Sequence, residues 1–177
     1  LKFGYVGSAM QNIIPNILVD FKNEFPNVTF GLKEMDNQKQ IENLLSNDID
    51  IGFVRLDRVP RGIAIKPILK EPFCLVLPKN HPVDTTNFKG LHQLKDEPFI
   101  SFDPSYSPSY YEKIMQIFDE SGFSPIISHN TIHAASIYKL VENNFGLSIV
   151  PKSLQNGYNL DVKFIELNKV SQRTTLS

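Results

Sequence analysis

The sequence predicts an α/β protein built from two lobes, and two observations carry this prediction. Segments with strand-like apolar patterns alternate with segments whose apolar residues recur at helical spacing, along the whole chain. The second half repeats the strand, helix, strand order of the first half without any visible sequence repeat. A chain of 177 residues is long enough for two such lobes, each of fewer than about 100 residues.

The first half is predicted to contain four strands and two helices. The strands cover residues 2–6, 28–33, 49–54 and 63–69, and the stretch "IDIGFV" at 49–54 has the near-continuous apolar character of a parallel strand covered on both faces. A first helix is expected before Pro26 and a short second one before Asn47, from apolar residues at helical spacing: Ile14, Ile17, Leu18, Phe21 and Phe25, then Ile41, Leu44 and Leu45.

The second half is predicted to contain five strands and two helices. The strands cover residues 71–78, 98–102, 125–128, 146–151 and 160–167, and a loop occupies most of 78–98. One helix carries a stripe from Tyr111 to Phe118 and ends with Gly122 at the C′ position, and the other runs from Ala134 to Val141.

Composition excludes several classes of protein. The net charge of −1 gives no global field that would attract nucleic acid or an anionic membrane. Cys74 is the only cysteine, so an internal disulfide and a multi-cysteine metal site are excluded, and we expect the thiol to be buried. No apolar run approaches the roughly 20 residues of a membrane helix, and no signal peptide is visible. Because the sequence does not begin with methionine, we interpret it as part of a longer chain.

Motifs of catalysis and cofactor binding are weak or missing. The sequence contains no G-x-S-x-G, no G-K-[ST] phosphate loop and no G-x-G-x-x-G. His129 and His133 are four residues apart, but the glutamate of H-E-x-x-H is missing, and we expect His129 in the turn before the helix. We therefore predict a protein that is not an enzyme and holds no metal or cofactor. An enzyme on a two-lobe scaffold is an alternative with little support.

The stretch "GYVGSAM" presents Ser8 just before a predicted helix, with two interpretations. Ser8 and Gln11 have the S-x-x-Q spacing of a capping box, which indicates an ordinary helix cap. Pro15 removes one helical hydrogen bond and crowds the carbonyl of Gln11, so regular helix is expected to begin only near Asn12. A loose first turn would then leave the Ser8 hydroxyl facing a ligand.

A basic cluster follows the predicted strand at 49–54. The stretch "RLDRVPR" holds Arg55, Arg58 and Arg61, and Arg55 leaves the carboxyl end of that strand, where α/β sheets bind ligands. A guanidinium there suits a carboxylate or phosphate. The alternative is a solvated loop whose arginines pair with Asp57.

The segment "SFDPSYSPSYY", residues 101–111, begins with Ser101 and is rich in hydroxyls, prolines and tyrosine rings. It leaves the end of a second-lobe strand, so it is expected to face the same cleft as the first-lobe residues. Its hydroxyls, backbone N–H groups and rings suit a small anionic or aromatic ligand. The alternative is a rigid connector with ordinary helix caps.

Four segments, in this order, resemble the effector-binding domain of LysR-type transcriptional regulators: "FGYVGSAMQNIIPNILVDFKNEFPNVTF", "LLSNDIDIGFV", "EPFCLVLPKNHP" and "NNFGLSIVPKSL". The resemblance implies two Rossmann-like lobes joined by two crossing strands, a type 2 periplasmic-binding-protein-like fold with the inducer in the cleft. It implies a first lobe over 1–72, a second over 73–164, and a return crossing over 165–177, with the end of the first lobe missing.

The resemblance also implies site residues. The opening is similar to that of regulators of aromatic-acid degradation, including muconate-responsive ones, and implies ligand contacts at Ser8, Asn37, Pro108, Ser109 and Tyr110. Asn37 stands where threonine is frequent in that branch, and Tyr110 stands where phenylalanine is usual. The charge of the ligand would be held by backbone N–H groups at helix N-termini and by the hydroxyls of Ser8 and Ser109.

The function implied is that of a ligand-sensing regulatory domain whose effector is a small carboxylate. Further implications are a homodimer or tetramer, a cytoplasmic location, no membrane contact, and DNA binding only through a winged helix-turn-helix outside this sequence. The alternative is a periplasmic solute-binding protein of the same fold.

Overall fold

The chain forms two compact units, each with its own sheet and apolar core. A computed structural model describes residues 1–11 and 13–177. Unit 1 contains Leu1–Lys70 and Thr175–Ser177, and unit 2 contains Glu71–Thr174.

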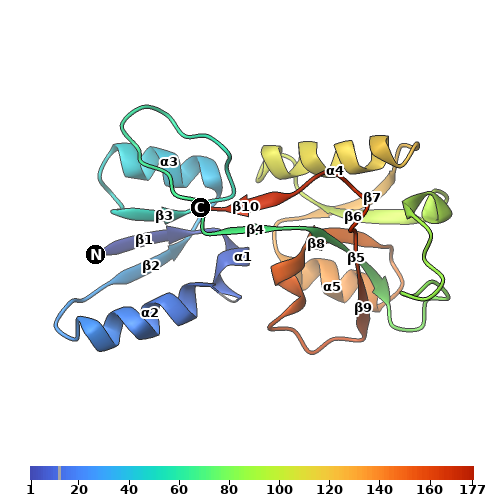
Figure 1. The fold of residues 1–177 in the computed structure, drawn as a ribbon, viewed down its shortest axis with the longest axis horizontal. Helices are drawn as coiled ribbons and strands as arrows, with labels where there is room; N and C mark the ends of the chain where they lie inside the picture. Colours follow the sequence, from blue (N-terminus) through green and yellow to red (C-terminus); the bar gives the residue numbers. More distant parts are fainter. Residues whose placement is uncertain (12) are drawn as a thin grey trace. The chain divides into compact units, whose positions relative to one another are not determined.

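Unit 1 is organised by a parallel sheet with the strand order β2-β1-β3, formed by β1 (Lys2–Tyr5), β2 (Gly31–Glu34) and β3 (Ile51–Phe53) (Figure 1). Tyr5 pairs with Glu34 on one side and with Phe53 on the other. The carboxyl ends of the described strands therefore meet at one edge of the sheet, and the segments that leave this edge are brought together.

The alternation of side chains along β1 and β3 gives the unit 1 sheet two different faces. Phe3 and Phe53 pack with Ala9 of α1 (Gly7–Met10) and Ile14 of α2 (Ile13–Glu24). Gly4 and Gly52 face α3 (Asn37–Leu45), as the close approach of its Gln40 side chain to both glycines shows. The expected start of regular helix near Asn12 lies outside the described residues.

Unit 2 is centred on β5 (Phe73–Pro78), whose six residues are all buried. β5 pairs antiparallel with β8 (Ser148–Pro151) and β9 (Val162–Glu166), while β6 (Pro98–Phe102) and β7 (Ile126–Thr131) form a parallel pair (Figure 1). A parallel bridge from Phe99 to Leu147 links the two groups of strands.

Two helices cover the two faces of the unit 2 sheet. Phe73, Leu75 and Leu77 lie in a cluster with Ile114 and other residues of α4 (Pro108–Glu120). Val76, on the other face of β5, lies in a second cluster with residues of α5 (Ala134–Glu142). Short 3₁₀ helices, η1 (Leu91–Leu94) and η2 (Lys152–Gln155), complete the unit. Gly122 follows α4 with φ +81°, the left-handed conformation expected of a C′ glycine.

The chain passes between the units along β4 (Leu69–Glu71) and β10 (Thr174–Leu176), which pair with each other. The division of the chain differs from the predicted one at residues 71–72 and 165–174, which belong to unit 2. β9 continues to Glu166 against β5, and the Leu167 N–H donates to the Phe73 carbonyl at 2.9 Å. These backbone bonds hold the return segment in unit 2 beyond position 165.

Three predicted elements differ from the structure. Residues 63–68 are not strand, since Pro67 has no N–H to give to a ladder and β4 begins only at Leu69. β2 begins at Gly31, pairs with β1 at the edge of the sheet, and is exposed along its length rather than half-buried. His129 lies on β7, paired with Ile100, because the β6 backbone extends the strand through polar residues up to Thr131.

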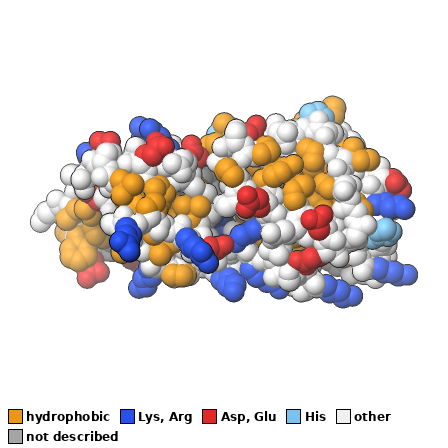
Figure 2. Space-filling model, turned by 90° about the horizontal axis from the view of Figure 1, so that it is seen from above, with side chains coloured by type: hydrophobic (Ala, Val, Ile, Leu, Met, Phe, Trp, Pro, Cys, Tyr) orange, Lys and Arg blue, Asp and Glu red, His pale blue; other side chains and the backbone are white. Residues whose placement is uncertain are grey.

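Charged side chains of both signs lie on the face of the molecule shown in Figure 2, as the net charge of −1 leads one to expect. None of the helices within the described residues combines the length and the apolar character needed to cross a membrane.

The single thiol is buried, as the sequence predicts. Cys74 lies on β5 with no exposed surface, and Gln155 Nε2 lies 2.9 Å from its Sγ. Burial raises the pKa of this thiol to about 11, so the reactive thiolate is scarce at neutral pH. We expect an aromatic disulfide reagent at pH 8 to leave the folded protein unmodified and to titrate one thiol in denaturant. Rapid reaction of the folded protein would contradict this burial.

Candidate functional site

Three of the predicted binding residues come together at the carboxyl edge of the unit 1 sheet. Arg55 follows β3, Ser8 lies in α1 after β1, and Asn37 is the first residue of α3 after β2. Arg55 Nε donates to Ser8 Oγ at 2.7 Å. Each residue leaves a different strand at the same edge, which is why positions far apart in the sequence meet. We call Ser8, Asn37 and Arg55 the arginine cluster.

Asn37 holds the backbone of Arg55 through both ends of its amide. Its Oδ1 accepts from the Arg55 N–H at 2.9 Å, and its Nδ2 donates to the Arg55 carbonyl at 3.4 Å. Asn37 is positioned because α3 begins there: Asp36 caps the helix, accepting from the Lys39 N–H at 2.7 Å. Asn37 and Arg55 are 6% and 9% exposed, so the guanidinium projects from a backbone that is fixed and shielded from water.

Gln40, which was not predicted as a site residue from the sequence, holds the same edge of the sheet through hydrogen bonds. It is fully buried, and its Nε2 donates to the Met35 carbonyl at 3.2 Å and to the Phe53 carbonyl at 3.1 Å. The amide fits because Gly4 and Gly52 carry no side chain: a Cβ would lie 3.1 Å from Gln40 Cγ at Gly4 and 2.9 Å from Gln40 Oε1 at Gly52. Gln40 therefore ties together the segments that carry Asn37 and Arg55.

Replacement of Gln40 by methionine is expected to destabilise the protein by about 1–3 kcal/mol, because the buried carbonyls of Met35 and Phe53 lose their side-chain donor. The free energy of unfolding in urea measures the effect. Gln38→Met is the matched control, since Gln38 lies on the same helix with an exposed side chain and is expected to change stability by less than about 0.5 kcal/mol. Equal effects of the two substitutions would contradict the supporting role of Gln40.

Ser8 does not act as the helix cap that one interpretation of the sequence predicts. α1 begins at Gly7, its N-cap residue is Val6, and no side chain caps it. Ser8 is thus the second helical residue, and its hydroxyl accepts from Arg55. α1 is only four residues long.

The Glu34 carboxylate also lies near the arginine cluster. A Cβ placed on Gly7 would lie 2.7 Å from Glu34 Oε1, so Glu34 covers the start of α1. Burial, followed by the charge of Glu34, raises the pKa of the Tyr5 hydroxyl, which therefore stays protonated at neutral pH.

The remaining predicted residues lie in unit 2, at β6 and the start of α4. Ser101 is buried at the end of β6, and its Oγ donates to the Phe102 carbonyl at 3.1 Å. Pro108 occupies the first position of α4 and is exposed, and Ser109 follows it with a half-buried side chain. Ser107, the N-cap residue of α4, makes no capping hydrogen bond with its side chain.

Tyr110 is placed as a core residue of unit 2. Its side chain is 6% exposed, its hydroxyl donates to the Ile149 carbonyl, and its ring packs edge-on against Phe73 and Phe102. The expectation that it contacts a ligand came from the resemblance. Because the ring and the hydroxyl are both engaged within the unit, we leave Tyr110 out of the proposed site.

Neither the other arginines of the basic cluster nor the histidine pair forms a site in the structure. Arg58 and Arg61 are exposed, unlike Arg55. His129 lies on β7 and His133 is the N-cap residue of α5, so the two do not share a helix. Among residues 1–11 and 13–177, no group of three or more histidine, cysteine or acidic side chains is arranged to hold a metal ion.

Comparison with known proteins identifies the family. The family described as LysR substrate binding domain matches residues 1–174. The sequence is 30% identical over 170 residues to the HTH-type transcriptional regulator AlsR of Bacillus subtilis, covering 96% of this chain and 56% of that protein. It is 27% identical over 169 residues to BenM of Acinetobacter baylyi, covering 94% of this chain and 56% of BenM. The chain thus spans about half the length of these relatives.

The fold agrees with this assignment. The structure of the BenM effector binding domain with its effector benzoate has a TM-score of 0.86 and 27% identity, and the match covers 99% of this chain and 80% of that one. These relatives are transcriptional regulators, which gives no support to the periplasmic alternative. The resemblance predicted from the sequence is confirmed, and the chain belongs to the LysR substrate-binding domain family, with its type 2 periplasmic-binding-protein-like fold.

Proposed function

We propose that this chain senses a small carboxylate through the arginine cluster of unit 1 and reports it to the rest of a LysR-type regulator. The carrying observation is the Arg55 guanidinium, bonded through Nε to Ser8 and held in its backbone by Asn37. The cluster lies at the carboxyl ends of parallel strands, which is where α/β sheets bind ligands.

The chemistry of the cluster favours a carboxylate over a neutral ligand. A guanidinium is permanently charged and presents its N–H groups in a planar fork that matches a carboxylate. Shielding from water strengthens such a bond, and a backbone already fixed by Asn37 loses little entropy when the ligand binds. The nearby Glu34 carboxylate limits the attraction, so a monocarboxylate is favoured over a dianion.

Relatives narrow the ligand class. BenM has benzoate as its effector. We therefore include aromatic carboxylates in the proposal, as expected for the aromatic-acid branch. The proposal also includes contacts from Ser101, Pro108 and Ser109, which the resemblance and the hydroxyl-rich segment predicted.

The rest of the proposal concerns the whole protein. We include DNA binding through a helix-turn-helix domain, a homodimeric or tetrameric assembly, a cytoplasmic location and the lack of catalysis, and the support for these is that the relatives are transcriptional regulators. The effector then acts by preferring one conformation of the regulator, since a ligand shifts an equilibrium only by its difference in affinity for the two states.

Calorimetric titration tests the proposal with benzoate, cis,cis-muconate and short aliphatic acids, each paired with its amide. We expect at least one acid to bind while its neutral amide binds at least about tenfold more weakly. Ser8→Ala and Ser109→Ala test the two hydroxyls separately, and Tyr110→Phe is expected to leave affinity unchanged. Acids and amides of equal affinity would contradict a charged site.

A further inference from the structure

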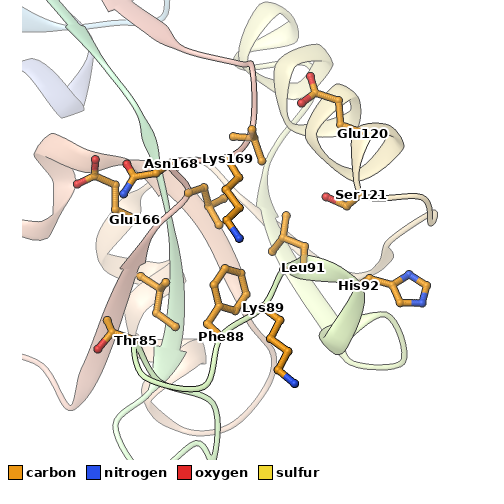
Figure 3. Close-up of a pocket in the computed structure, with 14 residues that line it drawn as sticks. Thr85, Phe88, Lys89, Leu91, His92, Glu120, Ser121, Glu166, Asn168 and Lys169 are labelled. Atoms are coloured by element: carbon orange, nitrogen blue, oxygen red, sulfur yellow. The ribbon is translucent and has the colours of Figure 1, made fainter.

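Unit 2 contains a cavity that lies apart from the arginine cluster. Its volume is about 510 Å³, within the range of about 300–1,000 Å³ typical of small-molecule pockets (Figure 3). The loop from Thr85 to Gly90, the start of η1, the end of α4 and the segment from Ile165 to Val170 line it. All of these residues belong to unit 2, whereas the arginine cluster belongs to unit 1.

The floor of the cavity is apolar and firmly held. Leu91, Ile165 and Leu167 are buried members of the main core cluster of unit 2, and Phe88 and Val170 pack against that cluster. The walls are therefore part of the folded core, and their position does not depend on a ligand. An apolar floor of this kind accommodates an aromatic ring or an aliphatic chain.

The two carboxylates at the rim are already engaged within the protein. Glu120 accepts from the Ser171 N–H at 2.9 Å, from the Ser171 hydroxyl and from Gln172 Nε2 at 3.1 Å. These hydrogen bonds, with that of the Ser171 hydroxyl the strongest, hold the pKa of Glu120 below its usual value. The hydrogen-bond donors of Glu120 are neutral, so its carboxylate keeps its charge, whereas Glu166 is ion-paired with Lys152 at 2.5 Å.

The two lysines at the rim differ from the two carboxylates, which are engaged within the protein. Within the part of the chain that the structure describes, the ammonium groups of Lys89 and Lys169 make no ion pair. Figure 3 shows Lys169 extending over the cavity toward Phe88 and Leu91, with Lys89 on the lower rim. The two lysines outweigh the one remaining carboxylate, that of Glu120, and the net charge beside the apolar floor is therefore positive.

We propose that this cavity is a second ligand site, which binds an organic acid with an apolar body. The carboxylate pairs with Lys169, with Lys89 as a second cation, and the apolar body lies on Phe88, Leu91 and Val170. This inference does not depend on the proposed function of unit 1.

Titration of 2-naphthoate into the Arg55→Ala protein tests the site, because that variant lacks the cation of the arginine cluster. We expect saturable binding of one equivalent, weakened about threefold by Lys169→Ala, because Lys169 is exposed. We expect binding to be abolished by Thr85→Trp, which fills the cavity from an exposed position. Lys95→Ala is the matched control, since Lys95 is an exposed lysine just past η1 that does not line the cavity.

Three results separate this proposal from the proposed function. If Lys169→Ala weakens the binding of 2-naphthoate to the wild-type protein while Arg55→Ala leaves it unchanged, this site stands and the arginine cluster does not bind this acid. If Arg55→Ala abolishes all binding of naphthoate at millimolar concentration, the second site is wrong. Equal affinities of the Lys169→Ala and Lys95→Ala proteins would overturn it as well. Circular dichroism confirms that each variant is folded.

Discussion

Substitution of Arg55 by alanine is expected to weaken the binding of a small carboxylate by about 100-fold, because hydrogen bonds to a charged group contribute about 1.5–3 kcal/mol. The protein is expected to remain folded, since Asn37 holds the backbone N–H and carbonyl of residue 55, which alanine keeps. Isothermal titration calorimetry measures the affinity, and urea unfolding measures the stability of the variant.

The controls for Arg55 come from its own loop. Arg55→Lys keeps the charge but loses the planar fork and the Nε bond to Ser8, so we expect an intermediate loss of about tenfold. Arg58→Ala removes an exposed arginine three positions along and is expected to change affinity by less than about twofold. A loss in Arg58→Ala equal to that in Arg55→Ala would indicate a general field effect of the loop rather than a specific contact.

The largest loss of stability is expected from Gly146→Ala. Gly146 has φ +154°, and a Cβ there would lie 2.8 Å from the Pro98 carbonyl oxygen. That oxygen accepts a hydrogen bond from the Leu147 N–H at 2.9 Å. The bond joins the first residue of β6 to the residue just before β8. A backbone atom cannot shift without disturbing the strand that carries it. Strain and overpacking together are therefore expected to lower the free energy of unfolding by about 2–4 kcal/mol, which is measured as a lower urea midpoint.

Gly122→Ala is the control that separates the strain of a positive φ from the steric clash expected at Gly146. Gly122 also has a positive φ, of +81°, but a Cβ there meets no atom within 4 Å. The expected cost is therefore only the conformational term, about 1 kcal/mol. If the two alanine variants were equally stable, the close approach of Gly146 to Pro98 would not be a determinant of this fold.

The order of elements was predictable because apolar spacing is a local signal. The buried run at β5 and the stripe on α4 were read directly from residues 73–78 and 111–118. One error arose where tertiary pairing decided the outcome: His129 lies on a strand because its backbone pairs with β6. Residues 63–68 are not strand although most of their side chains are apolar. The pairing of His129 with β6 is not encoded within a few residues of sequence, whereas Pro67 is a local signal against a strand at 63–68.

The site was predictable in part. The strand end after residue 54 indicated Arg55, the stretch around Ser8 offered a cap or a ligand contact, and the resemblance to a known family favoured the contact and supplied Asn37. Gln40 was missed, although its helical spacing to Asn37 and Leu44 places it on the buried face of α3. Its role depends on carbonyls at Met35 and Phe53 and on the room left by Gly4 and Gly52, which come from other strands.

The central claim is that the Arg55 guanidinium binds the carboxylate, and the Nε–H resonances of arginine test it most directly. The chain has only four arginines, at 55, 58, 61 and 173, and Arg55→Lys assigns the relevant signal by its disappearance from the ¹⁵N–¹H spectrum. On titration with a carboxylate that binds, the account predicts a saturable shift of the Arg55 Nε–H signal, with the affinity found by calorimetry, while the signals of the exposed Arg58 and Arg61 stay in place. Saturable binding with an unmoved Arg55 signal would contradict the account.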